Sequence, residues 1–271
     1  MDLTSLEEVA ALVRSAGDAV MEVYACAFDV ESKADGSPVT EADKRAEEII
    51  LRGLDDVAPG VPVISEEAAS SQDGATTPDQ DGNGDGPRLF WLVDPLDGTK
   101  EFVSRNGEFT INVALVQDGV PVLGVVLAPA VDRLFAAAPG ARPTVEDGAG
   151  RRAICARVTP PEGATIVASR SHGNTDALAR FTADRKIAAS LAAGSSLKFC
   201  LVAAGQADLY PRFGRTMEWD TAAGDAILRA AGGRVEDLEG QTLRYGKPGF
   251  ENPHFVAHGA ARLAAAPTHP G

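Results

Sequence analysis

The chain has 271 residues, a mass of 28.1 kDa, 44% hydrophobic residues and a formal net charge of −14. The length suits one large domain or two closely packed halves, and no apolar run reaches the ~18 residues that a membrane helix needs, so no membrane span is expected. A pI of about 4.7 argues against nonspecific binding of nucleic acid, which depends on a basic surface.

The cysteines and the first residues indicate the compartment. Three cysteines lie far apart and form no CxxC pair, which predicts reduced thiols. Residues 1–8 are acidic and lack the basic and apolar regions of a signal peptide. We therefore expect a cytoplasmic protein.

Two amphipathic helices are predicted near the start. The first covers residues 4–28, with Thr4 or Ser5 as its N-cap and apolar residues at three- and four-residue spacing. The second follows Thr40 and extends to about Val57. Thr40 is its expected N-cap and Asp43 its third residue, an arrangement that satisfies free backbone N–H groups at a helix start. By itself, this pattern indicates capping.

A short strand, residues 61–65, is predicted to end in Glu66-Glu67. Adjacent glutamates at the end of a strand are usually surface residues. Residues 68–88 are rich in Ser, Asp, Gly, Thr and Pro and contain almost no apolar residues. We expect this segment to be a mobile surface insertion between two core strands.

The stretch from Phe90 to Phe102 combines an apolar strand with two carboxylates. The strand is expected to be buried on both faces and to break into a turn at Asp94-Pro95, with a helix after the turn. In such a turn Asp94 and Asp97 can direct their oxygens into one site, with the Leu96 carbonyl between them. Hard divalent cations prefer these ligands. Asp-Pro and Asp-Gly also occur in ordinary turns, so both interpretations stay open here.

A β-hairpin is predicted next, because residues 109–127 alternate between apolar and polar around Asp118-Gly119. Residues 133–138 are expected to form another strand, and residues 139–153 a turn-rich connection. Together with the earlier strands, these elements predict a mixed sheet flanked by the first two helices.

The pattern changes near Pro160-Pro161, which we take as the boundary between an N-terminal α+β sub-domain, residues 1–158, and a C-terminal α/β sub-domain, residues 159–271. Strands are expected at 164–168 and 207–210, and helices at 176–183, 195–204 and 221–231. This alternation predicts layers of helix and sheet, with the two sub-domains facing each other across a cleft.

Three stretches of the second half carry polar residues at predicted element ends. Asp220 begins a small-residue helix, as an N-cap aspartate does. Ser195 and Lys198 belong to a Gly-Ser-Ser-Leu-Lys helix start, which fits a phosphate cradle as well as an ordinary capped helix. His172 follows a strand in Ser169-Arg-Ser-His, a position where a histidine is more often a surface residue than a ligand.

Four of these stretches together resemble the lithium-sensitive inositol monophosphatase superfamily. The matching residues are Val39, Thr40 and Asp43, then Glu66-Glu67 after a strand, then Asp94-Pro95-Leu96-Asp97-Gly98-Thr99, and finally Trp219-Asp220-Thr221-Ala222-Ala223-Gly224. The ending Lys100-Glu101-Phe102 is most similar to the bacterial 3'(2'),5'-bisphosphate nucleotidase branch. The resemblance extends from Val39 to Gly233, and so covers most of the chain.

The resemblance implies a layered α-β-α-β-α sandwich of mixed α+β and α/β class, with the site in the cleft between the sub-domains. It implies two or three Mg²⁺ ions, held by Glu66, Asp94, the Leu96 carbonyl, Asp97 and Asp220. Glu67 in place of Glu66 stays open. The catalytic residues that it implies are Asp43, Glu66 and Thr99. The substrate-binding residues that it implies are Gly98, Thr99, Ser169, His172, Ser195, Lys198 and Asp220.

The implied activity is a Mg²⁺-dependent phosphatase that removes the 3'-phosphate of adenosine 3',5'-bisphosphate, a small-molecule substrate, to give AMP. In this branch the activity clears a by-product of sulfate assimilation, and lithium is an inhibitor. A monomer or a homodimer is expected. One departure supports the branch: inositol monophosphatases carry an acidic residue seven positions before Asp220, where this chain has Phe213. Phe213 with Arg212 and Arg215 suits an adenine base and a second phosphate better than a polyol.

Three alternatives compete with this hypothesis. A phosphatase for inositol monophosphate or fructose 1,6-bisphosphate would share every metal ligand and differ in its pocket. A non-catalytic metal-binding protein would be expected to lack Asp43, Thr99 or a ligand, and all are present. A nucleotide-binding module of the Rossmann type would show GxGxxG after its first strand, and the sequence has none.

Overall fold

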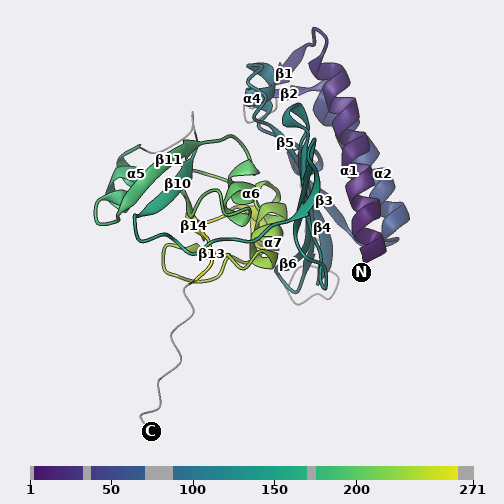
Figure 1. Cartoon of the computed structure of the whole chain (residues 1–271). Coiled ribbons are helices and arrows are strands. Elements are labelled where there is room, and N and C mark those ends of the chain that lie inside the picture. Colours follow the sequence, from purple (N-terminus) through teal and green to yellow (C-terminus); the bar gives the residue numbers. More distant parts are fainter. Residues whose placement is uncertain (1–2, 33–37, 71–87, 170–174, 262–271) are drawn as a thin grey trace.

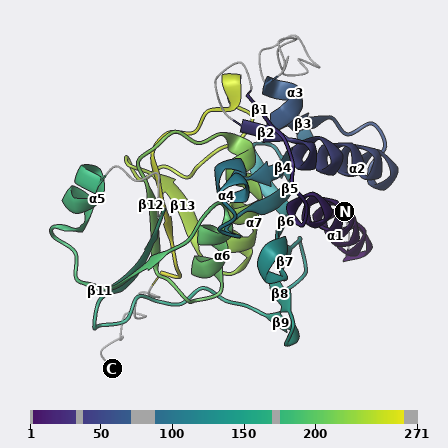
Figure 2. The ribbon, with the colours of Figure 1, turned by 90° about the horizontal axis from the view of Figure 1, so that it is seen from above.

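The computed structural model describes residues 3–32, 38–70, 88–169 and 175–261. Its layers are, in order, α1 (Leu3–Tyr24) with α2 (Glu41–Val57), a seven-stranded sheet, α6 (Leu197–Ala203) with α7 (Ala222–Ala230), a five-stranded sheet, and α5 (Thr175–Thr182) (Figure 1). The α-β-α-β-α order that the resemblance implies is therefore confirmed. Figure 2 shows the same order from above, with α1 and α2 side by side against the large sheet. Within the described ranges, no helix is both long and apolar enough to cross a membrane.

The seven-stranded sheet follows chain order. Its strands are β3 (Val63–Ser65), β4 (Leu89–Asp97), β5 (Thr110–Gln117), β6 (Val120–Ala128), β7 (Arg133–Ala137), β8 (Thr144–Asp147) and β9 (Gly150–Ala153). β3 pairs with β4 in parallel, and each later pair is antiparallel. The hairpin predicted around Asp118-Gly119 is confirmed, and both turn residues have positive φ, 48° and 71°, as the favoured two-residue hairpin turn requires.

The turn-rich connection predicted over residues 139–153 contains two strands that were not predicted, because β8 and β9 form a further hairpin there. Val145 is the buried side chain of this hairpin, and the residues of β9 are all exposed. A hairpin at the sheet edge buries too little apolar surface to produce the alternating pattern by which a half-buried strand is recognised.

The prediction that the chain breaks into a turn at Asp94-Pro95 is wrong, because β4 continues to Asp97. Asp94 lies opposite Asn112 and Asp97 lies opposite Thr110, so β4 uses one residue more than β5 between these pairs. This bulge accommodates Pro95, which has no N–H to donate to the ladder. The helix predicted after it is α4 (Thr99–Val103), and the chain reaches α4 through Gly98 at φ 91°.

The two N-terminal helices differ in how well their starts were predicted. α1 begins at Leu3, so Thr4 and Ser5 lie inside its first turn and the predicted N-cap is wrong. The capping box of α2 is confirmed: the Thr40 side chain accepts from the helix start, and the Asp43 carboxylate accepts the Thr40 N–H at 2.8 Å. Between the helices, β1 (Val30–Ser32) pairs with β2 (Pro38–Thr40). α3 (Glu66–Ser70) follows β3, and residues 71–87 of the predicted insertion lie outside the described part of the chain.

The five-stranded sheet has the order β11-β10-β12-β14-β13. Its strands are β10 (Ala164–Ala168), β11 (Ile187–Ala192), β12 (Leu209–Arg212), β13 (Arg234–Asp237) and β14 (Phe255–His258). β10, β11 and β12 run parallel, and β14 returns antiparallel between β12 and β13. The predicted bounds of two strands, 164–168 and 207–210, and of the three helices agree with the structure within two or three residues. β11, β13 and β14 were not predicted.

α7 packs very closely on the large sheet because Gly124 of β6 lies directly beneath it. A Cβ at Gly124 would overlap the carbonyl oxygen of Ala223 and lie 2.9 Å from the Ala226 Cβ. On the other side of α7, a Cβ at Gly224 would lie 2.7 Å from the ring of Phe199 in α6. The first contact holds the start of α7 against the seven-stranded sheet, and the second holds it against α6.

We expect Gly124→Ala to destabilise the protein by about 1–3 kcal/mol, the usual cost of overpacking a filled core. The measurement is urea-induced unfolding of both proteins. Gly148→Ala is the matched control, because a Cβ there meets nothing within 4 Å and Gly148 does not have positive φ. Equal unfolding midpoints for the two variants would contradict the close packing described for α7.

Candidate metal centre and active site

Four carboxylates from three elements lie near one another at the C-terminal end of β4. Asp94 and Asp97 lie on β4, Glu66 is the first residue of α3, and Asp220 is the last residue of the 3-10 helix η2 (Glu218–Asp220) before α7. Asp94 and Glu66 share a hydrogen bond, and the charges of Glu66, Asp97 and Asp220 all act on Asp94. The structure thus brings together the four carboxylates that the resemblance selects.

Burial and mutual repulsion make these carboxyl groups hard to ionise together. Burial first, and then the charges of Glu66, Asp97 and Asp220, raise the pKa of Asp94 well above its usual value. Burial, Asp97 and Glu66 likewise raise the pKa of Asp220, against the Met217 N–H that donates to its carboxylate. Such a cluster needs either protons or cations to neutralise it.

Asp97 has a buried, positively charged neighbour, Lys198. Burial raises the pKa of Asp97 to about 6, although the ammonium of Lys198 and the N–H of Ser196 oppose the shift. The same burial lowers the pKa of Lys198 to about 8, against the raising effect of Asp97. Lys198 is itself buried, and its Nζ donates to the Ser195 carbonyl at 2.6 Å and lies 5.2 Å from the centre of the Tyr210 ring.

The donors in this cluster suit a hard divalent cation. They are carboxylate oxygens, together with the backbone carbonyl of Leu96 between Asp94 and Asp97 in the chain. Lys198 compensates part of the negative charge at Asp97, and Arg212 part of that at Asp220. Among the described residues, no three His, Cys, Asp or Glu side chains form a ready-made ligand shell. The residues present therefore fit Mg²⁺ by the chemistry of their donor set and not by a preformed ligand geometry.

Thr99 and Asp43, two of the catalytic residues that the resemblance implies, are in contact. Thr99 Oγ1 lies 3.2 Å from Asp43 Oδ1 and 3.2 Å from the Leu96 carbonyl oxygen. The other Asp43 oxygen accepts from both the N–H and the hydroxyl of Thr40, at 2.8 and 2.7 Å. The α2 capping box therefore fixes an aspartate whose remaining oxygen faces Thr99, so capping and a role in the site are compatible.

Glu66 and Glu67, which the sequence left as alternatives, have different surroundings. The charge of Glu66 acts on all three aspartates, whereas that of Glu67 acts on Lys44. Glu47, which the sequence analysis did not select, accepts a hydrogen bond from Ser65 immediately before Glu66. This geometry favours Glu66 as the ligand.

A buried polar junction joins β4 and β5 to the residues just before α6 at Asp97. Ser196 N–H donates to Asp97 Oδ2 at 2.7 Å, and Ser196 Oγ contacts Asn112 Oδ1 at 2.5 Å and Thr110 Oγ1 at 2.9 Å. Ser195, at φ 49°, donates its hydroxyl to the backbone carbonyl of Asp97 at 2.8 Å. Ser195 therefore holds Asp97 in place as well as lining the pocket beside it.

The pocket next to the carboxylates collects most of the predicted substrate contacts. It is lined by Asp97, Gly98, Glu101, Ser169, Ser195, Lys198, Tyr210, Arg212, Thr216, Asp220 and Thr221. Thr99 and Lys100 do not line it, and His172 lies outside the described residues. Phe213 packs instead against Phe181 and His254, with ring centres 5.7 and 6.2 Å apart.

Several residues of the site were not selected from the sequence. Asn112 and Thr110 carried a usable signal, because they are polar positions on one face of a strand whose other residues as far as Val116 are apolar. Tyr210 carried none, because an aromatic residue in a predicted strand is normally a core residue.

Comparison with known proteins places this geometry in a family. The family model described as "Inositol monophosphatase family" matches residues 2–268. The 3'(2'),5'-bisphosphate nucleotidase CysQ of Escherichia coli (strain K12) is 46% identical over 253 residues, covering 92% of this chain and 98% of that protein. CysQ of Buchnera aphidicola is 40% identical and covers 93% of this chain and 92% of that protein. The chain belongs to the inositol monophosphatase family.

The same comparison with solved structures supports the fold. The crystal structure of CysQ from Bacteroides thetaiotaomicron, described as a bacterial member of this family, has a TM-score of 0.77 and 36% identity, and covers 96% of this chain and 97% of its own. The inositol monophosphatase of Thermotoga maritima has a TM-score of 0.73 at 25% identity, with coverage of 94% and 92%. The layered fold described above is thus the fold of the family.

Proposed function

We propose that this chain is a Mg²⁺-dependent 3'(2'),5'-bisphosphate nucleotidase, which removes the 3'-phosphate of adenosine 3',5'-bisphosphate to give AMP. The observation that carries the proposal is the 46% identity, over 92% of the chain, to a protein named for this activity. The two cationic side chains in the pocket, Lys198 and Arg212, support it because the substrate carries two phosphates. A cytoplasmic location and a monomeric or homodimeric state stay predictions.

In this proposal Glu66, Asp94, the Leu96 carbonyl, Asp97 and Asp220 hold two or three Mg²⁺ ions. When bound, Mg²⁺ supplies positive charge to the phosphate oxygens and lowers the pKa of a coordinated water. The high negative charge of the cluster favours such binding, because cations remove the repulsion that raises the pKa values of Asp94 and Asp220.

Thr99 and Asp43 are placed to move one proton. The Thr99 hydroxyl takes the proton of the attacking water while its own proton passes to Asp43 Oδ1, 3.2 Å away. Thr40 holds Asp43 in the orientation that this transfer needs, through the two hydrogen bonds to the other oxygen. Glu66 assists by orienting the water. The attack is in line at phosphorus, and no covalent phosphoenzyme forms.

The substrate is tested by phosphate release with Mg²⁺ on three compounds at equal concentration: adenosine 3',5'-bisphosphate, inositol 1-phosphate and fructose 1,6-bisphosphate. We expect a preference of at least tenfold for the nucleotide, which corresponds to about 1.4 kcal/mol of transition-state discrimination. A sugar phosphate as the preferred substrate would leave the metal centre in place and contradict the proposed pocket.

Arg212 is expected to recognise the second phosphate. Arg212→Met should raise KM for adenosine 3',5'-bisphosphate by about tenfold, the loss of one charge-assisted contact, while leaving turnover of 3'-AMP nearly unchanged. Arg215→Met is the matched control, because Arg215 is an exposed arginine that pairs with Glu251 and does not line the pocket. Equal effects of Arg212→Met on both nucleotides would remove Arg212 from this role.

A further inference from the structure

The connection that carries Asp220 is fixed by its own backbone on one side. Met217 N–H donates to Asp220 Oδ2 at 2.8 Å, and Asp220 N–H donates to the Met217 carbonyl at 3.2 Å. The turn is one 3-10 turn long, with only three residues in η2. So short a turn has few hydrogen bonds of its own, and its position depends on what packs around it.

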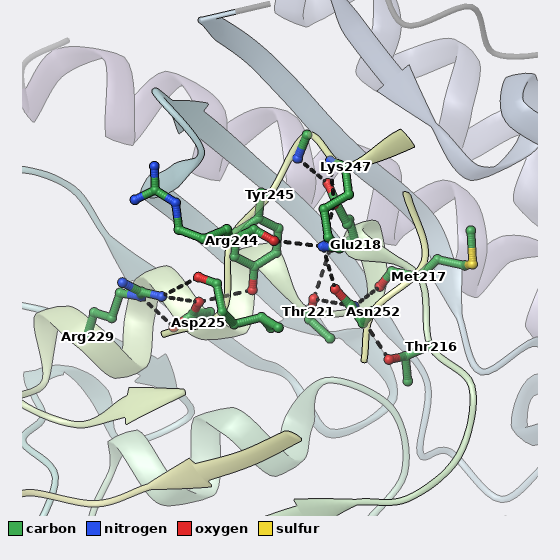
Figure 3. Close-up of polar contacts among 12 residues, drawn as sticks. Thr216, Met217, Glu218, Thr221, Asp225, Arg229, Arg244, Tyr245, Lys247 and Asn252 are labelled. Carbon is green, nitrogen blue, oxygen red and sulfur yellow. Dashed lines mark hydrogen bonds and ion pairs between the residues drawn. The ribbon is translucent and has the colours of Figure 1, made fainter. Parts of the chain in front are cut away.

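Residues 244–252, which we call the strap, pack around this turn through Glu218. Glu218 is fully buried and accepts three hydrogen bonds from the strap: Gly246 N–H at 2.6 Å, Lys247 N–H at 3.0 Å and Lys247 Nζ at 2.6 Å. Figure 3 shows Lys247 directed at the Glu218 carboxylate. A buried carboxylate with a matched ammonium and two N–H groups has one well-defined position.

Asn252 closes the strap on the other side of the turn. Its Nδ2 donates to the Met217 carbonyl at 2.8 Å and lies 3.0 Å from Thr221 Oγ1, and its Oδ1 accepts from Lys247 Nζ at 3.2 Å (Figure 3). Met217 and Thr221 are the residues immediately before and after η2. Both ends of the turn that carries Asp220 are therefore bound to the strap.

The strap also contacts the seven-stranded sheet. Tyr245 N–H donates to the Gly119 carbonyl at 3.1 Å, and Arg244 donates to the Asp118 carbonyl at 2.6 Å, so the strap lies on the β5–β6 turn. Gly246 lies against Phe90 of β4, where an added Cβ would be 3.4 Å from the ring. β4 is the strand that carries Asp94 and Asp97. The strap thus links the sheet that holds two of the carboxylates to the turn that holds Asp220.

We propose that the strap sets the position of Asp220 relative to Asp94 and Asp97, with Glu218 and Lys247 as positioning residues for the metal centre. This inference rests on the proposed function only in taking these aspartates as metal ligands. Neither Glu218 nor Lys247 lines the pocket, so neither touches the substrate. Their effect is on cation affinity, because a cation shared between two sub-domains binds tightly only when the ligands from both are held at the right separation.

The test compares Mg²⁺ binding in Lys247→Met with that in wild type. The concentration of Mg²⁺ needed for a given rise in Tm above that of the metal-free protein is expected to increase by about tenfold or more, as when a residue that orients a metal ligand is removed. The Mg²⁺ concentration for half-maximal phosphate release should increase by the same factor, with kcat at saturating Mg²⁺ nearly unchanged. Lys247→Arg keeps the cation and should restore the wild-type value.

Arg157→Met is the matched control. Arg157 donates to the fully buried carboxylate of Asp208 at 2.8 Å, and its side chain is 38% exposed against 30% for Lys247. Both variants leave a buried carboxylate without its cation, so both should lower the Tm of the metal-free protein. Only Lys247→Met should change the Mg²⁺ dependence.

Equal Mg²⁺ dependence in Lys247→Met, Arg157→Met and wild type would overturn the inference. If Lys247→Met does not fold, the same Mg²⁺ titration is made on Glu218→Gln, which keeps the side-chain shape. The same increase in the required Mg²⁺ concentration is expected. The Tm titration uses no substrate, so it separates this inference from the proposed function. A wild-type protein that binds Mg²⁺ but hydrolyses no nucleotide would contradict the proposed function. The Tm values of the variants would still test the effect of the strap on Mg²⁺ binding.

Discussion

Asp97→Asn is expected to reduce kcat by about 10³-fold or more while leaving the fold intact. The reason is that one metal-ligand charge is worth several kcal/mol of transition-state stabilisation, and each 1.36 kcal/mol is a factor of ten in rate. The fold should survive because an asparagine oxygen can still accept the Ser196 N–H that now reaches Asp97 Oδ2 at 2.7 Å. The measurement is single-substrate turnover at saturating Mg²⁺, with circular dichroism and Tm as checks on folding.

The matched control for this prediction is Asp147→Asn. Asp147 is a carboxylate of the same sheet, paired with Arg152 at 2.8 Å, and it lies in β8, away from the pocket. Its loss should leave kcat unchanged. Wild-type turnover in Asp97→Asn would show that the assignment of the metal centre is wrong.

The second large effect is expected in the stability of the metal-free protein. Asp94, Asp97 and Asp220 all have raised pKa values in the folded state, that of Asp97 being about 6 against 3.8 for a free aspartate. Between these values the folded protein binds more protons than the unfolded chain. The free energy of unfolding must therefore fall as the pH rises from about 4 through 6 and beyond, and recover on acidification.

The size of this effect follows from the shift of one group. A shift of about two pKa units corresponds to on the order of 2–3 kcal/mol, and the three aspartates share the same repulsion, so their contributions do not add. Mg²⁺ should reverse the trend, because it neutralises the cluster without protons. The measurement is urea unfolding from pH 4.5 to 8, once with EDTA and once with Mg²⁺.

Asp220→Asn separates the cluster from other ionisable groups. Without Mg²⁺ this variant should be more stable than wild type at pH 7 and should show a weaker pH dependence, because one of the repelling charges is gone while the asparagine oxygen can still accept the Met217 N–H. With Mg²⁺ the order should reverse. Asp147→Asn should behave in the opposite way without Mg²⁺, because the hydrogen bond from Arg152 holds the pKa of Asp147 at about 2. A metal-free wild type whose stability does not change between pH 5 and 7 would contradict the repulsion described here.

The acidic cluster lies in a buried part of the protein, where its charge lowers stability. A buried set of carboxylates destabilises the protein unless something neutralises it. Lys198 compensates part of the charge at Asp97, and its pKa of about 8 reflects the cost of its own burial. A divalent cation would bind to the remaining negative charge. The same charge therefore lowers the stability of the metal-free protein and raises its affinity for the metal.

The sequence by itself determined the features that depend on neighbouring residues. The capping box at Thr40 and Asp43 and the hairpin at Asp118-Gly119 are local, because a side chain three residues away or two positive φ angles suffice to form them. The motif around Asp97 was recognisable as a string of residues, and it indicated the family. The layered fold followed from the alternation of helical and strand patterns.

Only the tertiary structure decided how the site is held together. The N–H that fixes Asp97 comes from Ser196, 99 residues later, and the partners of Glu218 come from a strap 28 and 29 residues away. β4 continues through Pro95 because it pairs with β5. The β8–β9 hairpin forms at the edge of the sheet, where it buries little apolar surface and so leaves little pattern in the sequence. Local propensity carries no information about such contacts, because their free energy is gained only when distant segments pack and exclude water from the groups between them.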